Sequence, residues 1–208
     1  MLNRLRLRIV GAGGSVTRSE WLERAAAMGA GLVSGGIVVG GFASLAASSP
    51  SKTQDVEVLN VALAFEELQS DFYARAVRGL ALQGDWLQFA TVVGAQERAH
   101  VSFVRRALGA AANPAPRLTL SRPPSSVAEF QHLAVVLEDI GVALYNGQAG
   151  NLTSGALAAA AEIVSVEARH AAWARDLAGE VPAPVATEVP ADLEQVKARL
   201  AQAGVQVG

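Results

Sequence analysis

The stretch AQERAHVSF at residues 95–103 decides the fold, and VSVEARHAAWAR at residues 164–175 repeats its pattern. Each stretch contains one Glu-x-x-His motif, and residues three positions apart lie on the same face of a helix. The four motif residues are Glu97, His100, Glu167 and His170. Apolar residues recur at helical spacing around both motifs, which indicates that this face is buried. The two stretches therefore predict two helices that direct polar side chains into a core.

Two single glutamates lie on apolar faces of the same kind. Glu66 follows the run LNVALAF, and Glu138 lies within LAVVLEDIGVALY. Each glutamate is followed seven residues later by a tyrosine, Tyr73 or Tyr145, and two helical turns place that tyrosine on the glutamate's own face. We interpret both tyrosines as hydrogen-bonding or packing partners of the site rather than as redox-active groups.

The apolar periodicity predicts five helices, and the fold class is all-α. Alanine is abundant and only 5% of the residues are aromatic, which favours helices over strands. The predicted helices span 55–80, 84–109, 125–147, 154–179 and, as a short amphipathic segment, 191–203. Connections that are short, long and short between the first four are typical of a four-helix bundle with one long crossover. Two hairpins joined in this way bring the four glutamates and two histidines to similar depths.

The chemistry of these side chains points to metal ions. Carboxylates buried without partners carry a free-energy penalty of several kcal/mol each. Two divalent cations would balance the four negative charges, and one neutral imidazole per ion would complete ligand sets that suit iron or manganese. The chain has no cysteine, which excludes thiolate zinc sites and cysteine-ligated iron–sulfur centres. The net charge of −2, without basic runs beyond the first residues, argues against a nucleic-acid partner.

We interpret residues 1–47 as an export signal or a membrane anchor. Basic side chains come first, and residues 25–47 contain no charged side chain, a length that can cross a bilayer as a helix. The sequence TRSEWL at 17–22 resembles a twin-arginine signal, although Ser19 replaces the second arginine. Cleavage after the small-x-small sequence SLA at 44–46 would release the rest of the chain, and an uncleaved segment would tether it.

The predicted organisation of the chain has four parts. They are the signal or anchor at 1–47, a linker at 48–54, the bundle at 55–180 and a C-terminal tail with the short helix at 181–208. Because basic residues precede the apolar segment, a cytoplasmic N-terminus is favoured. We therefore expect an exported or membrane-anchored protein with its bundle outside the cytoplasm, in a bacterial periplasm or at the cell surface.

The sequence resembles the ferritin-like superfamily over about residues 55–180. The similarity rests on the two Glu-x-x-His stretches and on LNVALAFEELQSDFY and LEDIGVALYNGQA. In that superfamily, one glutamate from each of two helices joins a Glu-x-x-His from each of two others. The local phrases are similar to a bacterial branch that includes plant desiccation-related proteins. The resemblance implies a metal-ligand set of Glu66, Glu97, His100, Glu138, Glu167 and His170.

The same resemblance implies roles for these ligands. Glu97 and Glu167 would bridge two divalent metal ions, and Glu66 and Glu138 would be terminal ligands. Iron is the favoured metal, with manganese as the alternative. The implied activity is an O₂- or peroxide-dependent oxidase or ferroxidase reaction, with metal ions and O₂ or peroxide as partners. The sequence selects no substrate and assigns no catalytic residue.

A second hypothesis is a membrane-tethered structural or interaction subunit without turnover. The incomplete twin-arginine signal and the glycine-rich segment at 25–47 favour it, because they are compatible with an uncleaved anchor. The partner would then be the bilayer or a larger membrane complex, and a homo-oligomer fits either hypothesis. A mature N-terminus near Ala47 would indicate a released domain, and a retained Met1 would indicate an anchor.

Overall fold

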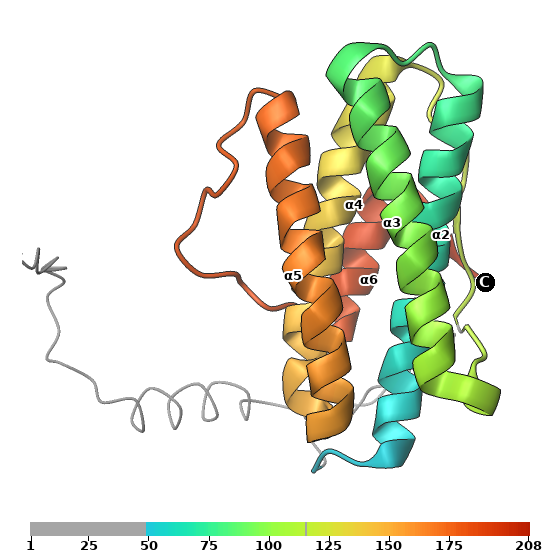
Figure 1. The fold of residues 1–208 in the computed structure, drawn as a ribbon, viewed down its shortest axis with the longest axis vertical. Coiled ribbons are helices and arrows are strands. Elements are labelled where there is room, and N and C mark those ends of the chain that lie inside the picture. Colours follow the sequence, from blue (N-terminus) through green and yellow to red (C-terminus); the bar gives the residue numbers. More distant parts are fainter. Residues whose placement is uncertain (1–48, 115) are drawn as a thin grey trace, which may run out of the picture. The chain divides into compact units, whose positions relative to one another are not determined.

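The computed structural model describes residues 49–114 and 116–208, and its elements carry the labels of Figure 1. Four long helices form a bundle. They are α2 (Lys52–Gly79), α3 (Gly84–Leu108), α4 (Val127–Gln148) and α5 (Ser154–Leu177). The four long helices predicted from the sequence are confirmed, and their ends differ from the predicted ones by at most three residues. The predicted signal or anchor at 1–47 lies outside the described residues.

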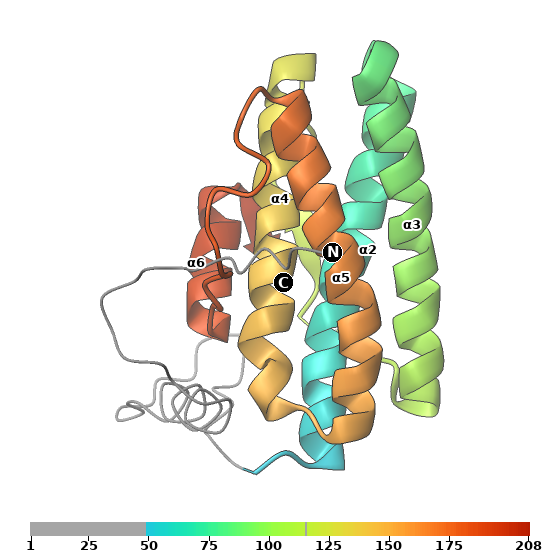
Figure 2. The same ribbon diagram turned by 60° about the vertical axis from the view of Figure 1, so that its left-hand side comes forward.

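The bundle consists of two helical hairpins. Helix α2 packs along α3, and α4 packs along α5, while α3 also contacts α5 and α2 contacts α4. Figures 1 and 2 show that α2 and α5 run in one direction and that α3 and α4 run in the other. All neighbouring helices are therefore antiparallel, which requires the long connection between α3 and α4 to return along the whole bundle. Within the described part of the chain, no helix is both long and apolar enough to cross a membrane.

Helix α2 begins earlier than the sequence predicts. The hydroxyl of Ser51 accepts a hydrogen bond from a backbone N–H of the first turn at 3.2 Å, so that Ser51 is the N-cap and the helix starts at Lys52. The last three residues of the segment interpreted as a linker, 48–54, are therefore helical. The same turn holds α5 in place, because Asp55 accepts hydrogen bonds from the backbone N–H and hydroxyl of Thr153 at 2.8 and 2.6 Å.

The described structure is mostly helical, as the all-α prediction expects, and it adds a pair of short strands that the sequence analysis did not predict. The crossover contains the short helix η1 (Gly109–Ala111) and the strand β1 (Leu118–Leu120), which pairs antiparallel with β2 (Val205–Val207) near the C-terminus. A second short helix, η2 (Ala149–Asn151), lies between α4 and α5. Both strands alternate apolar and polar residues over only three positions, which is too short a pattern to identify a strand.

The C-terminal tail is part of the fold. Helix α6 (Leu193–Gln202) packs on α4 outside the bundle, as Figure 2 shows. Before it, the backbone N–H of Ala191 donates to the carbonyl of Ala143 at 3.2 Å, and Ala191 is fully buried. A Cβ atom at Gly147 would lie 1.8 Å from the carbonyl oxygen of Ala191, so only glycine allows this contact. The tail thus covers the outer face of α4.

The core consists of two apolar clusters, and polar side chains lie between them. Along α3, the Glu-x-x-His motif follows Val93 of the first cluster and precedes Val104 of the second. Along α5, the motif lies between Ile163 of the second cluster and Ala174 of the first. The first cluster holds most of the aromatic rings. They are Phe65, Phe72, Tyr73, Phe89 and Phe130, with the half-buried Trp86 and Trp173 packed against the cluster.

Candidate metal centre

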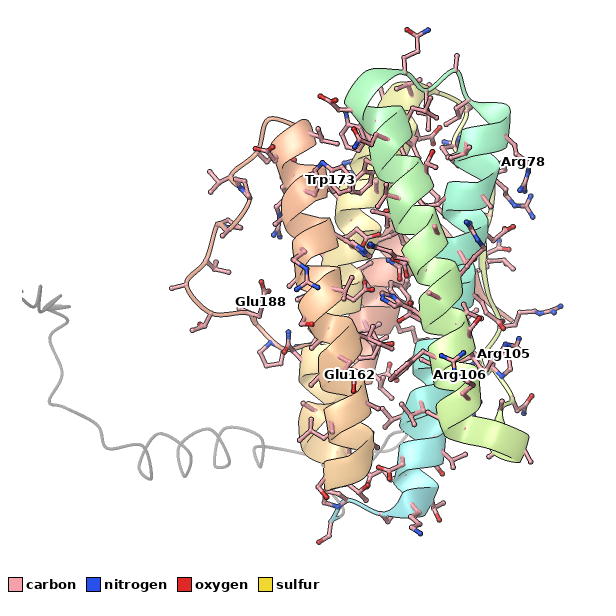
Figure 3. The ribbon with its side chains drawn as sticks, in the orientation of Figure 1. Arg78, Arg105, Arg106, Glu162, Trp173 and Glu188 are labelled. Carbon is pink, nitrogen blue, oxygen red and sulfur yellow. The ribbon has the colours of Figure 1, made fainter. Side chains whose placement is uncertain are left out.

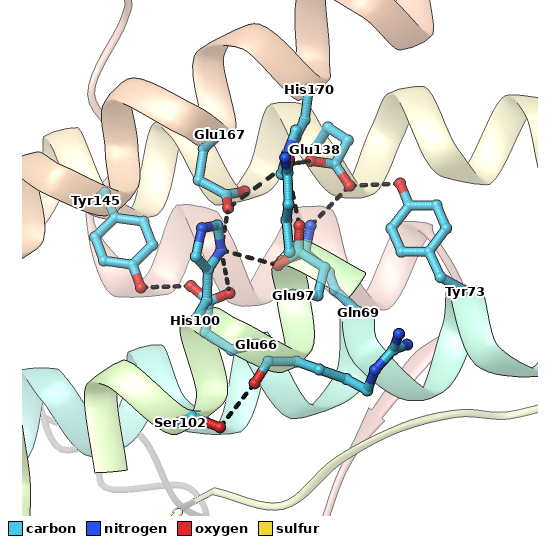
Figure 4. Close-up of polar contacts among 12 residues, drawn as sticks. Glu66, Gln69, Tyr73, Glu97, His100, Ser102, Glu138, Tyr145, Glu167 and His170 are labelled. Atoms are coloured by element: carbon cyan, nitrogen blue, oxygen red, sulfur yellow. Dashed lines mark hydrogen bonds and ion pairs between the residues drawn. The ribbon is translucent and has the colours of Figure 1, made fainter. Parts of the chain in front are cut away.

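The six side chains singled out in the sequence meet in the middle of the bundle (Figure 4). They form two overlapping groups, and the nitrogen and oxygen atoms that each group offers to a metal lie within 4.8 Å of one another. One group is Glu66, Glu97, His100 and Glu167, and the other is Glu97, Glu138, Glu167 and His170. Glu97 and Glu167 belong to both groups, which is the distribution that bridging carboxylates need. All four glutamates are 0% exposed.

The ring of His100 faces three carboxylates at once. Its Nδ1 lies 3.0 Å from Glu167 Oε1, 3.2 Å from Glu97 Oε2 and 3.3 Å from Glu66 Oε2. A single N–H group can donate to only one of these oxygens with good geometry, and the contact with Glu97 is the hydrogen bond. The remaining oxygens are close to the ring but lack a donor.

The ring of His170 is oriented by a hydrogen bond at Nε2. Its Nε2 lies 2.5 Å from the side-chain oxygen of Gln96, an acceptor, so Nε2 carries the proton and donates. In the neutral ring, Nδ1 then presents a lone pair, which lies 3.0 Å from Glu97 Oε1 and 3.4 Å from Glu138 Oε2. Lone pairs that face carboxylate oxygens repel one another unless a cation or a proton lies between them. This tautomer is the one that a metal ligand requires.

Each tyrosine bonds across the bundle. Tyr73 Oη of α2 donates to Glu138 Oε1 of α4 at 2.5 Å, and Tyr145 Oη of α4 donates to Glu66 Oε1 of α2, as Figure 4 shows. The sequence spacing placed each tyrosine on the face of its own glutamate, but the partner belongs to the other hairpin. These bonds leave the second oxygen of each glutamate, Oε2, directed at the histidines.

Two glutamines of the site were not identified from the sequence. Gln69 donates from Nε2 to Glu138 Oε1 at 3.0 Å, and Gln96 accepts from His170. For Gln69 a signal existed, because a fully buried amide interrupts the apolar stripe three residues after Glu66. For Gln96 there was none, since its role depends on how α3 packs against α5.

Burial controls the protonation of the cluster. It raises the pKa of Glu97 and of Glu167 well above the ordinary value, and the neighbouring carboxylates raise both further. Burial lowers the pKa of His100, but the carboxylates of Glu167, Glu66 and Glu97 close to its Nδ1 outweigh this and raise the pKa to about 12. Without a cation, burial therefore favours the protonated forms of Glu97 and Glu167.

The unsatisfied atoms of the cluster test whether a metal fits. Among the six side chains, the buried atoms without a hydrogen-bond partner are Glu66 Oε2, Glu97 Oε1, Glu138 Oε2, both oxygens of Glu167, and His170 Nδ1. These are the atoms that face the interior of the two groups, and such atoms are rare in folded proteins. Four carboxylates and two imidazoles form an oxygen-rich donor set that matches two divalent ions of the iron or manganese type. The residues present fit the metal pair that the sequence predicts.

The fold and these residues can be compared with known families. A model of the ferritin-like domain family matches residues 54–180, which include all six side chains. The chain belongs to the ferritin-like domain family. A comparison with curated proteins found no match. The narrower relation to desiccation-related proteins stays a prediction from the sequence.

Within the described residues, a pocket of the ferritin-like bundle reaches the cluster. It measures about 360 Å³, opens between α3 and α5, and is lined by both histidines together with Gln96, Arg169 and Trp173. The histidines are 8% and 3% exposed, so they form its floor while the glutamates lie behind them. A larger pocket of about 600 Å³ between β1, α4 and α6 contains none of the six side chains. The pocket therefore opens the histidine side of the cluster toward solvent between α3 and α5.

Proposed function

We propose that the bundle binds two divalent metal ions, iron in the first place and manganese as the alternative, and uses them to reduce O₂ or peroxide. The observation that supports this proposal is the set of buried, unsatisfied oxygen and nitrogen atoms that converge from four helices. A purely structural polar core would be expected to pair these atoms with donors, because each unpaired buried carboxylate destabilises the fold. The ligands would be Glu66, Glu97, His100, Glu138, Glu167 and His170.

The metal pair, when bound, would supply two electrons, which with two protons convert O₂ to hydrogen peroxide or hydrogen peroxide to two water molecules. The protein's own residues hold the ligand set. Glu97 and Glu167 reach both groups from α3 and α5, and their negative charge favours the more highly charged state of the metal pair. Tyr73 and Tyr145 each donate to one oxygen of a terminal glutamate and so direct the other oxygen inward.

The environment of the cluster suits a redox reaction with a small molecule. Burial raises the pKa of Tyr73 and of Tyr145 well above the ordinary value, and the adjacent glutamates add to this, so both phenols stay protonated. The glutamates are inaccessible, and the pocket between α3 and α5 admits a ligand only to the histidine side. A small neutral oxidant such as O₂ or peroxide fits this route.

The first experiment measures metal content and reactivity. Full-length protein purified without chelator should contain two iron or manganese ions per chain by elemental analysis. The variant Glu167→Gln should lose them, because an amide supplies no charge to bridge two cations. The matched control is Glu162→Gln on the same helix, where the exposed side chain points away from the bundle (Figure 3). After anaerobic loading with Fe²⁺, the wild type and the control should consume O₂ or peroxide.

Two results would count against the proposal. If the wild type binds no metal, even after anaerobic loading with Fe²⁺, the metal centre itself is wrong. If it binds two ions but consumes neither O₂ nor peroxide, the metals are structural and the non-catalytic subunit becomes the better hypothesis. The variant and its control separate these outcomes from misfolding, provided that their helix content by circular dichroism matches the wild type.

The cellular location is proposed from the sequence alone. We infer from the basic start and the uncharged segment 25–47 that the bundle is exported or anchored outside the cytoplasm. N-terminal sequencing of the protein from its native membrane and soluble fractions tests this. A soluble mature chain that starts near Ala47 indicates export with cleavage, and a membrane-bound chain that starts at Met1 indicates an anchor. A soluble cytoplasmic chain that retains residues 1–47 would contradict both.

A further inference from the structure

The two hairpins repeat one pattern of residues. In the first, Glu66 precedes Tyr73 by seven residues and a Glu-x-x-His follows in α3; in the second, Glu138 precedes Tyr145 by seven and a Glu-x-x-His follows in α5. The structure extends the repeat, since each tyrosine donates to the glutamate of the opposite hairpin. Corresponding positions in the two hairpins can therefore be compared one by one.

At two corresponding positions the repeat is broken, and both breaks favour the same half of the site. Three residues after the first glutamate, α2 has Gln69 where α4 has Gly141. Immediately before the Glu-x-x-His motif, α3 has Gln96 where α5 has Val166. Gln69 donates to Glu138 and Gln96 accepts from His170, whereas glycine and valine side chains can form neither bond. Both glutamines therefore hold ligands of the group that contains Glu138 and His170, here called the Glu138–His170 position.

The terminal ligands of the Glu138–His170 position are fixed in orientation. Glu138 Oε1 accepts from both Tyr73 and Gln69, which leaves Oε2 as its inward-facing atom. Gln96 fixes the tautomer of His170, with Nδ1 as the free ligand atom. This half of the site already has the ligand orientation and the histidine tautomer that a cation requires, so little reorganisation accompanies binding.

The ligands of the other group, the Glu66–His100 position, are less constrained. Glu66 has Tyr145 as its only side-chain donor among the described residues, apart from the shared contact with His100. His100 Nε2 forms no hydrogen bond within the described part of the chain, and this ring is the more exposed of the two histidines, at 8% against 3%.

We propose that the two metal positions are inequivalent: the Glu138–His170 position binds the first ion tightly, and the Glu66–His100 position binds the second ion weakly and exchanges it. This proposal rests on the proposed metal centre but not on its redox activity. Each position has four ligands, two of them shared, so ligand number does not distinguish them. The difference comes from Gln69 and Gln96, which act as positioning residues through Glu138 and His170.

The test is an anaerobic titration of the full-length protein with Co²⁺, a redox-stable probe. Calorimetry and visible absorption monitor the binding. Two binding events are expected, with Kd values that differ by about tenfold or more, since partners that orient metal ligands typically change affinity by about 10–100-fold. A crystal grown with one equivalent of Co²⁺ should show anomalous scattering between Glu138 and His170. A weak chelator should then remove the second ion before the first.

Variants that remove a glutamine from one half of the site, or add one to the other half, identify the cause. Gln96→Val and Gln69→Leu should each weaken the first event by about 10–100-fold and bring the two events together. Gln96→Glu keeps an acceptor for His170 Nε2 and should retain the tight event. The reciprocal variant Val166→Gln places an amide in the pocket that His100 lines, and it should strengthen the second event. A purely structural role of Gln96 would predict neither the tight event retained by Gln96→Glu nor the stronger second event of Val166→Gln.

The outcomes separate this inference from the proposed function. Two events of equal affinity, or a first ion located between Glu66 and His100, would overturn the inequivalence and leave the dinuclear centre intact. Absence of any Co²⁺ binding by correctly folded protein would overturn both. Loss of the tight event in Gln96→Val together with its retention in Gln96→Glu would support the assignment of Gln96.

Discussion

Two adjacent regions of the bundle use the same four helices in opposite ways. At the end where α2 turns into α3, aromatic rings fill the core, with ring centroids 5.2 Å apart for Phe72 and Phe130 and 5.1 Å apart for Phe89 and Trp173. In the middle of the bundle, the same helices bury four carboxylates and two imidazoles whose inward atoms lack donors. Apolar burial stabilises the fold, whereas unpaired buried charge opposes it. The aromatic end therefore stabilises a polar layer that serves binding.

The largest expected effect comes from truncation at the aromatic end. Phe130 is 0% exposed and contacts Phe72 face to face and Trp86 edge to face. Phe130→Ala should lower the free energy of unfolding by about 3–5 kcal/mol, through lost burial and the cavity that remains. Denaturant unfolding in the presence of EDTA measures this. The matched control is Phe103→Ala, where the ring is half-buried and the loss should be smaller. Equal losses in the free energy of unfolding at both sites would show that the aromatic end contributes no more to stability than the half-buried ring of Phe103.

The polar layer should respond in the opposite direction. In EDTA, Glu167→Met should raise the free energy of unfolding by about 1–4 kcal/mol, because an apolar side chain of similar length removes an unpaired buried carboxylate and its repulsion with Glu97. Metal saturation should stabilise the wild type but not this variant. Thermal unfolding with and without Co²⁺ measures both effects. Glu162→Met is the control and should change little, since this side chain is exposed. A less stable variant in EDTA would mean that the carboxylate supports the metal-free fold.

The polar layer should also make stability depend on pH. Burial raises the pKa of Glu97 and Glu167, so the metal-free fold prefers them neutral, and the penalty for ionising them grows as pH rises above their ordinary value of about 4.5. The folded-state pKa of His100 is about 12, so its stabilising contribution is complete below the ordinary value of 6.5 and is lost progressively as pH rises toward 12. Both effects act in the same direction, so the Tm of the metal-free protein should decrease as the pH rises from about 5 to about 9.

Metal binding should reverse this trend, since cations replace the retained protons and bind more tightly as pH rises. The difference in Tm between Co²⁺-saturated and EDTA-treated protein should therefore widen from about pH 5.5 to about pH 8.5. Differential scanning calorimetry in matched buffers measures it. A constant difference across this range would indicate that the cluster does not exchange protons for metal.

The same contrast explains which parts of the structure the sequence predicts. Apolar periodicity is a local signal, and it located the four long helices and the short helix α6. The pairing of β1 with β2 joins Leu118 to Val207 over a long stretch of chain, and three residues carry too little pattern to reveal it. The contact of Ala191 with α4 depends on the missing side chain of Gly147, which is also visible only in three dimensions.

In the site, the sequence identified the six side chains that come together and both tyrosines, but not which ligand each partner contacts. Two Glu-x-x-His motifs and two single glutamates on apolar faces are local patterns, and the structure brings all six together. Each tyrosine donates to the glutamate of the other hairpin, and Gln96 contacts His170. Both features depend on how the helices pack side by side. These partners orient the ligands, so the difference between the two metal positions could not be derived from the motifs.

The smallest expected effect lies outside both regions, at the start of α4. The hydroxyl of Ser126 accepts a hydrogen bond from the backbone N–H of Glu129 at 3.2 Å and so caps the helix. Ser126→Ala should lower the free energy of unfolding by about 1 kcal/mol. The control is Ser165→Ala in the middle of α5, where the exposed serine bonds only to the carbonyl of Glu162 and alanine is the better helix former. That variant should be neutral or slightly more stable.

Both serine variants should retain wild-type Co²⁺ affinity in the titration, because the cap is exposed and neither serine contacts the cluster. A change in Co²⁺ affinity in Ser126→Ala would show that the start of α4 is coupled to Glu138, and the division between stabilising and binding regions would then fail for that helix.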